Sequence, residues 1–162
     1  MKITNEYVFF WSGFLSQWTA ESFSELGVTF NCCEQYMMWR KAILFKDYKV
    51  AELIINETDP SKIKQLGRRV KNYDEYVWSK HKYEIVITGN HLRFSQNPKS
   101  RDKLLSYSAK VTFVEASPYD KIWGIGMDEN HPDINNSTKW KGENLLGKAL
   151  TDVRDSFIKE IR

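Results

Sequence analysis

The sequence predicts an α+β fold in which helices dominate and a few short strands are segregated from them. Apolar residues recur at helical spacing through the middle and the end of the chain. The strand-like segments do not alternate regularly with these helices, which argues against a doubly wound nucleotide-binding fold. With 162 residues and no internal repeat, low-complexity tract or linker, the chain is expected to form a single domain over 1–162.

The first half of the chain is predicted to contain short strands and then helices. Its first thirty residues are rich in aromatic residues, glycine and serine, which is typical of loops and short strands. Apolar spacing predicts helices over about 32–45, 47–56, 59–67 and 74–94. The third begins with Asp59 as N-cap and Pro60 at the first helical position, and closes at Gly67. The fourth contains several β-branched residues but keeps helical spacing, and should end before Pro98.

The second half of the chain is predicted to hold one strand between two helices. A short helix is expected over about 99–106, and residues 110–115 alternate between apolar and polar side chains, as a strand does. A loop containing proline and glycine follows. The last helix should begin near Glu143. Its apolar face is formed by Leu146, Ala149, Leu150, Val153, Phe157 and Ile161.

Charge and cysteine content restrict the partners and the compartment. A net charge of +3 and a pI near 8.7 suit an anionic small ligand, and they are weak support for a dedicated nucleic-acid binder. The only cysteines, Cys32 and Cys33, are adjacent, and neighbours rarely bridge each other, so buried thiols in a reducing compartment are expected. The N-terminal segment does not resemble a signal peptide, and no apolar run approaches membrane length. We therefore expect a soluble, cytoplasmic protein.

One carboxylate, Glu34, lies in the first turn of a helix that is otherwise apolar and aromatic. An ionised carboxylate without partners is costly to bury. The sequence preferences of helix N-termini alone favour a capping box, because Asn31 and Glu34 have its spacing and the helix dipole stabilises a negative charge there. The alternative is a catalytic carboxylate. Lys41 lies on the same helical face two turns further on, where it could bind an anion in a pocket shared with Glu34.

A second cluster follows the strand that ends near residue 115. It contains the carboxylates Glu115 and Asp120, then Trp123 and Gly124. Junctions between strands and loops commonly present catalytic groups on a rigid base, but Asp120 could equally cap its own turn. The glycines at 124 and 126 lack the third glycine and the βαβ context of a dinucleotide fingerprint.

Two further features suggest ligand contacts. Lysines precede a helix start at Asn144, which could cradle a phosphate with its first N–H groups or be an ordinary Asn-initiated helix. Trp78 could stack on a base, although a lone tryptophan usually fills a core. The three histidines have no metal-ligand spacing, so no metal site is expected.

Several short motifs follow one another in a recognisable order along nearly the whole chain. They are Phe14-Leu15-Ser16, Gly27-x-x-Phe30-x-x-x-Glu34-Gln35-x-x-Met38-x-x-Lys41-Ala42, Gly67-Arg68, Trp78, Arg93-Phe94-x-Gln96-Asn97, Glu115-x-Ser117-x-x-Asp120-x-x-Trp123-Gly124-x-Gly126 and Gly142-x-Asn144-x-Leu146-Gly147. In this order and spacing the chain resembles the YbiA-like (NADAR) family. The resemblance implies a helix-rich fold and an N-glycosidase. Two substrate classes are implied: phosphoribosylated early intermediates of riboflavin biosynthesis, and ADP-ribose attached to guanine in nucleic acid.

The resemblance also implies roles for the residues that fall on the motifs. Cleavage of an N-glycosidic bond builds positive charge on the sugar, which suits Glu34 as base or charge stabiliser and Asp120 as second carboxylate. Trp78 would stack against the base or the ribose. The remaining candidates for substrate binding are Lys41, Arg68, Asn144, Trp123, Gly124 and Glu115. Hydrolysis needs only water, so neither a cofactor nor a metal is expected.

A non-catalytic module that binds NAD or an ADP-ribose-like ligand is the alternative function. The same tryptophan, arginine and asparagine would suffice for binding, whereas a pure binder needs no carboxylate such as Glu34 near the anomeric carbon. A non-specific nucleic-acid binder is less well supported, because the sequence has no stripe of Lys and Arg with repeated stacking residues. The expected partner is a phosphorylated ribosyl compound or ADP-ribosylated nucleic acid. No association with a membrane is expected.

Overall fold

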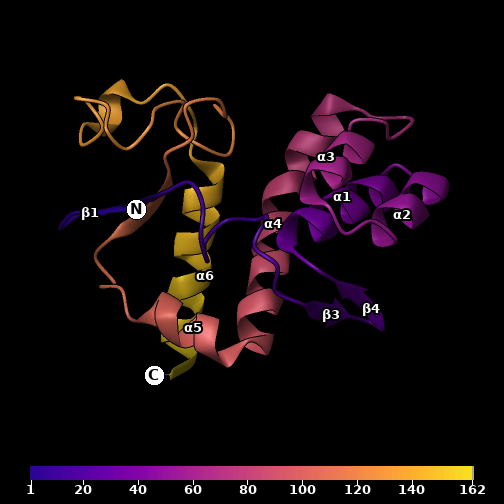
Figure 1. Cartoon of the computed structure of the whole chain (residues 1–162), viewed down its shortest axis with the longest axis horizontal. Helices are drawn as coiled ribbons and strands as arrows, with labels where there is room; N and C mark the ends of the chain where they lie inside the picture. The colour runs from indigo at the N-terminus through magenta and orange to yellow at the C-terminus, as the bar shows by residue number, and fades with distance from the viewer. Residues whose placement is uncertain (162) are drawn as a thin grey trace. The chain divides into compact units, whose positions relative to one another are not determined.

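The structure is a computed structural model that describes residues 1–161 (Figure 1). It divides into two compact units. The helical unit comprises residues 17–98, and the sheet unit combines residues 1–16 with the chain from residue 99 onward. The predicted α+β class, with helices dominant and short strands, is confirmed. The expectation of a single domain over 1–162 stays a prediction.

The helical unit consists of a β-hairpin and helices packed around α1. Its elements are β3 (Phe23–Glu25), β4 (Val28–Phe30), α1 (Cys33–Leu44), α2 (Tyr48–Ile55), α3 (Pro60–Gly67) and α4 (Glu75–Gln96). Helix α1 packs against α2, α3 and α4, and the antiparallel hairpin contacts α1 and α4. The rings of Phe23, Phe30 and Tyr36 pack together at this junction and are almost fully buried. Burial of such large rings supplies much of the stability of a small unit.

Local signals define the helix starts in this unit. The carboxylates of Asp47, Asp59 and Asp74 each accept a backbone N–H in the first turn of α2, α3 and α4, as N-caps do. At the end of α3, a Cβ atom on Gly67 would lie 2.0 Å from the sulfur of Met38, so glycine permits the close approach of α3 to α1. The predicted helices of this unit are therefore confirmed with almost their expected bounds.

The sheet unit contains a three-stranded sheet with helices and a long irregular segment. Its elements are β1 (Lys2–Ile3), β2 (Tyr7–Phe10), α5 (Pro98–Leu105), β5 (Thr112–Glu115), the 3₁₀ turn η1 (Ser137–Lys139) and α6 (Leu145–Ile161). The strand order is β1-β2-β5, with β1 antiparallel and β5 parallel to β2. Helix α6, yellow in Figure 1, packs on β5 through its predicted apolar face, of which Ile161 alone is exposed. Among residues 1–161, no helix has both the length and the apolar character that crossing a bilayer requires.

Two element bounds differ from the prediction for identifiable reasons. Helix α6 begins at Leu145 instead of near Glu143, because Asn144 has φ +55°, a left-handed conformation that a right-handed helix does not contain. Strand β5 begins at Thr112 instead of near residue 110, because the N–H of Val111 donates to the carbonyl of Ser108 and closes a turn.

Candidate active site

Glu34 lies almost fully buried in the first turn of α1, with 5% of its surface exposed. Its N–H donates to the carbonyl of Gln17 at 3.0 Å. The capping box expected between Asn31 and Glu34 is wrong: the N-cap residue is Cys32, and the N–H of Asn31 donates to the side-chain oxygen of Gln35 at 2.6 Å. Gln35 therefore makes the contact with the Asn31 N–H that a capping Glu34 would make.

The first turn of α1 is held by a buried amide pair. The side chains of Gln17 and Asn90 exchange two hydrogen bonds, at 2.9 and 3.0 Å, which fixes the chain before β3 against α4. The Sγ of Cys33 contacts the oxygen of Asn90 at 3.6 Å, and burial raises the pKa of this thiol to about 12. Cys33 is thus a neutral packing residue at physiological pH.

Lys41, two turns along α1, has its ammonium group between two aromatic rings. Its Nζ lies 4.7 Å from the ring centroid of Tyr73 and 5.6 Å from that of Trp78. Burial lowers the pKa of Lys41, whereas the charges of Glu34 and Glu75 raise it. Glu34 and Glu75 are therefore the two carboxylates whose charges act on this ammonium group.

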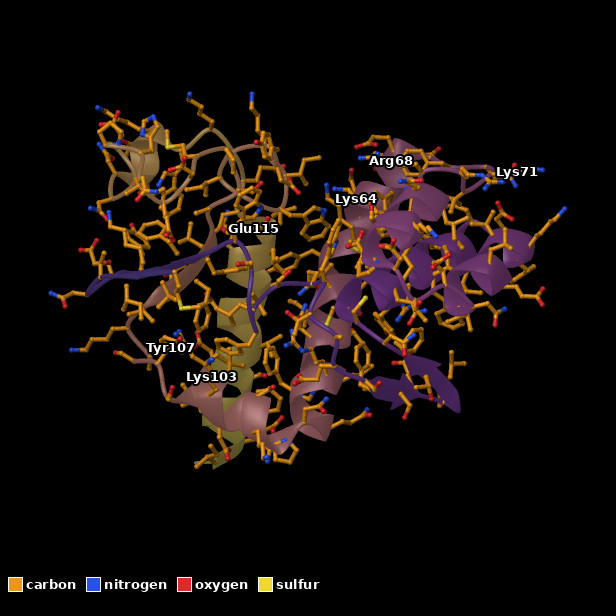
Figure 2. The ribbon with its side chains drawn as sticks, viewed as in Figure 1. Lys64, Arg68, Lys71, Lys103, Tyr107 and Glu115 are labelled. Atoms are coloured by element: carbon orange, nitrogen blue, oxygen red, sulfur yellow. The ribbon has the colours of Figure 1, made fainter. Side chains whose placement is uncertain are left out.

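Arg68 belongs to the same region of the helical unit. It follows Gly67 as the C-cap residue of α3 and is exposed (Figure 2). Its charge further lowers the pKa of Lys41, as expected of two nearby cations. The structure therefore gathers four predicted site residues of this unit into one neighbourhood: Glu34, Lys41, Arg68 and Trp78. Trp78 is 8% exposed, which agrees with the interpretation that it packs in the core, while its ring also faces a cation.

In the sheet unit, Asp120 organises the loop after β5. Its Oδ1 accepts the N–H groups of Ile122 and Trp123 at 2.9 and 2.8 Å, and its own N–H donates to the hydroxyl of Ser117. This is the turn-capping geometry that was one of the two interpretations of Asp120. A Cβ on Gly124 would lie 2.9 Å from the carbonyl oxygens of residues 115 and 120, so this turn requires glycine.

The start of α6 differs from the predicted phosphate cradle. The side-chain oxygen of Asn144 accepts the N–H of Glu115 at 2.9 Å, and its amide donates to the carbonyl of Phe113 at 3.0 Å. The backbone N–H groups of residues 144–146 donate to carbonyls of residues 122–124. With 2% of its surface exposed, Asn144 ties α6 to β5 and to the Asp120 loop, and these N–H groups bond within the protein. The cradle interpretation of this helix start is therefore overturned.

Sequence reasoning did not select Tyr73 or Glu75, which lie beside Lys41 in the structure. Tyr73 lies just before α4 and Glu75 is the first residue of that helix. No spacing rule in the sequence relates either of them to a residue on α1. Within residues 1–161, no group of three or more His, Cys, Asp or Glu side chains is arranged to hold a metal ion.

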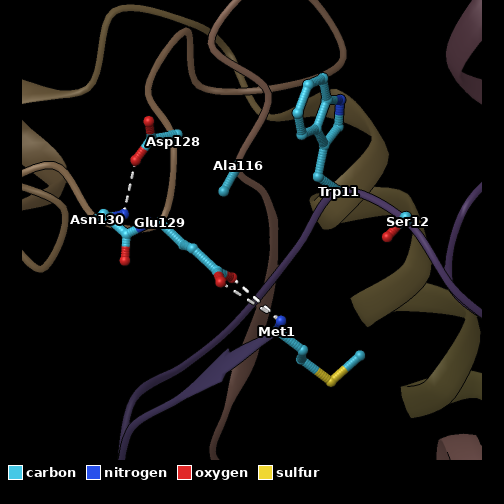
Figure 3. Close-up of a pocket in the computed structure, with 7 residues that line it drawn as sticks. All are labelled: Met1, Trp11, Ser12, Ala116, Asp128, Glu129 and Asn130. Carbon is cyan, nitrogen blue, oxygen red and sulfur yellow. Dashed lines mark hydrogen bonds and ion pairs between the residues drawn. The ribbon is translucent and has the colours of Figure 1, made fainter.

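A separate cavity of about 280 Å³ occurs within the sheet unit (Figure 3). It is lined by Met1, Trp11, Ser12, Ala116, Asp128, Glu129 and Asn130. A carboxylate oxygen of Glu129 lies 3.2 Å from the amino group of Met1. None of the predicted site residues lines this cavity, so we assign it no part in the chemistry of Glu34 and Asp120.

The fold is shared with a solved structure. The NMR structure of the E. coli protein YbiA aligns with a TM-score of 0.79, covering 99% of this chain and 89% of that one. The sequence identity is 24%, so this likeness concerns the fold.

Sequence comparison identifies relatives with named functions. The chain is 44% identical, over an alignment of 165 residues, to an N-glycosidase of Acanthamoeba polyphaga mimivirus, covering 94% of the chain and 96% of that protein. It is 29% identical over 119 residues to the chloroplastic riboflavin biosynthesis protein PYRR of Arabidopsis thaliana. That match covers 71% of the chain but 18% of the plant protein. The family model of the NADAR domain matches residues 9–158, and the chain therefore belongs to the NADAR domain family.

Proposed function

We propose that the protein hydrolyses the N-glycosidic bond between a phosphorylated ribosyl group and a base-like leaving group, with Glu34 as the catalytic carboxylate. The protein is a hydrolase acting on N-glycosyl bonds, since it is 44% identical over nearly its full length to a named N-glycosidase. The observation that carries the role of Glu34 is its burial in the first turn of α1, together with the effect of its charge on Lys41, which lies on the same helix.

Glu34 would act on the charge that develops as the base departs. Positive charge builds at the anomeric carbon, and a buried carboxylate next to it stabilises that charge more strongly than water does. The same carboxylate can take a proton from the attacking water, whose oxygen forms the new bond to the anomeric carbon. The N-terminus of α1 supports a negative charge at this position.

Lys41 and Arg68 would hold the phosphate. Burial is the main cause of the lowered pKa of Lys41 and the charge of Arg68 adds to it, so an anion bound beside both cations would favour the charged form of Lys41. Charge-assisted hydrogen bonds from an ammonium and a guanidinium are the usual means of binding phosphate oxygens. Trp78, whose ring faces the Lys41 ammonium, would contact the base or the ribose.

Asp120 is the proposed second carboxylate. Asp120 uses Oδ1 for its turn, and we assign its Oδ2 to a ribose hydroxyl or to the leaving group. Trp123 and Gly124 would shape the loop that presents it. Glu115 and Asn144 would support that loop from the end of β5, Asn144 through its hydrogen bonds and not by direct contact with substrate.

Two substrate classes fit this chemistry. A phosphoribosylamino-pyrimidine, an early riboflavin intermediate, is favoured by the name of the plant relative. ADP-ribose attached to guanine presents the same kind of bond next to phosphate groups. A module that binds such ligands without cleaving them, the alternative from the sequence, is disfavoured because the chain is 44% identical to a named N-glycosidase. We also propose a reducing, cytoplasmic compartment, in keeping with the free thiols of Cys32 and Cys33.

The test uses purified protein with each substrate class in parallel. Released base and sugar are followed by mass spectrometry, and the Glu34→Gln variant serves as control. Release by the unmodified protein, lost in the variant, supports the proposal, and the substrate that turns over identifies the class. Binding of either compound without release would favour the non-catalytic module.

A further inference from the structure

We propose that Tyr73 is a positioning residue whose ring holds the Lys41 ammonium group where it binds the substrate phosphate. This inference rests on the proposed function, which assigns the phosphate to Lys41 and Arg68. It adds a residue that lies on no motif of the family resemblance and that was found only from the geometry of the helical unit.

The contact between Tyr73 and Lys41 is a cation–π interaction in a partly buried place. The Nζ of Lys41 lies 4.7 Å from the Tyr73 ring centroid, closer than its 5.6 Å distance to the Trp78 centroid. Both distances lie within the range of about 6 Å over which a ring attracts an ammonium group. Tyr73 is therefore the nearer of the two rings that flank this cation.

The Tyr73 ring is itself held from several sides. It packs edge-on against Phe45, with centroids 5.5 Å apart and ring planes at 63°. Its hydroxyl donates a hydrogen bond to Oε2 of Glu75, whose charge also acts on Lys41. The chain is constrained on both sides of Tyr73, by Asn72 with φ +60° and by Asp74, the N-cap of α4. A ring fixed in this way is a firm support for a flexible side chain.

Lys41 needs such support more than an exposed lysine does. Its side chain is a flexible stem of four carbons, and fixing the bonds of this stem in one conformation costs entropy when a phosphate is bound. Burial and the charge of Arg68 both disfavour its charged form. The electron-rich face of the Tyr73 ring offsets part of this cost and orients the ammonium before the ligand arrives. Loss of the ring should therefore weaken phosphate binding without altering the Glu34 chemistry.

The experiment compares Tyr73→Leu and Tyr73→Phe with a matched control, Tyr76→Leu. The Tyr76 ring also carries a cation, but this cation is Lys80, at 4.1 Å, and not Lys41. Ribose 5-phosphate is the probe, and its dissociation constant is measured by calorimetry. We expect Tyr73→Leu to weaken binding by about tenfold, which corresponds to a cation–π contribution of ordinary size. Tyr73→Phe keeps the ring and should stay within about twofold, as should Tyr76→Leu.

Steady-state kinetics supply the second measurement. In Tyr73→Leu, KM for the phosphorylated substrate should rise by the same factor while kcat is retained, because the ring acts on binding and not on the bond that breaks. Denaturant melts show whether each variant is folded. Tyr73 is 42% exposed, so Tyr73→Leu should remain folded.

Three results would overturn the inference. They are unchanged binding in Tyr73→Leu, equal weakening in Tyr73→Phe, and equal weakening in Tyr76→Leu. Absence of any binding of ribose 5-phosphate by the unmodified protein would also overturn it, together with the phosphate role of Lys41. Because the binding assay needs no turnover, the expected pattern in a protein that hydrolyses neither substrate would refute the two proposed substrate classes and leave the role of Tyr73 standing.

Discussion

The side-chain oxygen of Gln35 accepts the backbone N–H of Asn31 at 2.6 Å, and this bond separates the roles of two neighbouring residues. Gln35 accepts the N–H of the residue before the N-cap of α1, and Glu34, one position earlier, does not take part in this hydrogen bond. A structural residue and a candidate catalytic residue are therefore adjacent in sequence and can be tested as a pair.

Substitution of Glu34 by Gln should abolish most turnover and leave the fold intact. Glutamine keeps the size of the side chain but removes the negative charge that stabilises the developing cation. We expect kcat to fall by about two to four orders of magnitude, with an unchanged urea midpoint. Single-turnover kinetics beside a denaturant melt check both parts. A rate close to that of the unmodified protein would remove Glu34 from the mechanism.

Substitution of Gln35 by Leu should do the opposite. The Gln35 amide donates to the carbonyls of Ile54 and Glu57 and accepts from Asn31, so leucine leaves buried polar groups unsatisfied. We expect a loss of about 3 kcal/mol of unfolding free energy, with kcat retained in the folded fraction. Equilibrium urea unfolding measures this loss. A stable variant with low kcat would contradict the division of roles.

Substitutions of Trp78 distinguish a role in core packing from a role in substrate binding. Its 8% exposure predicts that Trp78→Ala loses about 3–5 kcal/mol of stability, while Trp78→Phe loses less because it keeps an aromatic ring. If the ring also contacts substrate, Trp78→Ala should bind ribosyl substrate poorly even where it is folded. Melts and substrate affinity are measured on the same preparations. Instability combined with unchanged affinity would restrict Trp78 to the core.

Arg68 should contribute to phosphate binding in a way that its neighbour on α3 does not. Arg68→Ala removes one of the two proposed phosphate ligands and should weaken binding of a phosphorylated substrate by about tenfold. Lys64, an exposed lysine one turn earlier, is the matched control, and Lys64→Ala should leave affinity nearly unchanged (Figure 2). A dephosphorylated substrate should not distinguish the variants. Equal losses in both would indicate general attraction by positive charge.

The pH dependence of phosphate affinity should follow Lys41. Burial lowers its pKa below the ordinary 10.5, so its ammonium loses the proton earlier than an exposed lysine as the pH rises. Affinity for ribose 5-phosphate should fall as the pH passes through this lowered pKa. The folded protein binds fewer protons than the unfolded chain between the two pKa values, so stability should rise slightly there. Lys41→Arg, which stays charged, should show a flatter affinity profile between about pH 7 and 10.

The parts of the fold that depend on nearby residues could be predicted from the sequence. The start of α3 follows from Asp59 and Pro60, whose capping and backbone preferences act within one turn. The common face of Glu34 and Lys41 follows from helical periodicity alone. The pairing of β2 with β5 could not be predicted, because residues 11–111 separate these strands and pairing leaves no local signal.

The candidate site shows the same division. Tyr73 meets Lys41 only because the segment between α3 and α4 packs on α1, and sequence spacing carries no information about that contact. Asn144 marks a helix start in the sequence, but an asparagine amide can cap a helix or bond to a strand. In this structure its left-handed conformation directs the amide to β5.

The parallel pairing of β2 with β5 also constrains the order of folding. The helical unit, residues 17–98, is continuous in sequence, whereas the sheet unit is completed only by the chain from residue 99 onward. On the ribosome, residues 17–98 emerge before β5, and their mostly helical contacts are local and fast to form. β2 can pair with β5 only after residues 112–115 have been synthesised. Premature release of a chain that ends before β5 would leave the edge of β2 exposed to other chains, so truncated products should be the aggregation-prone species of this protein.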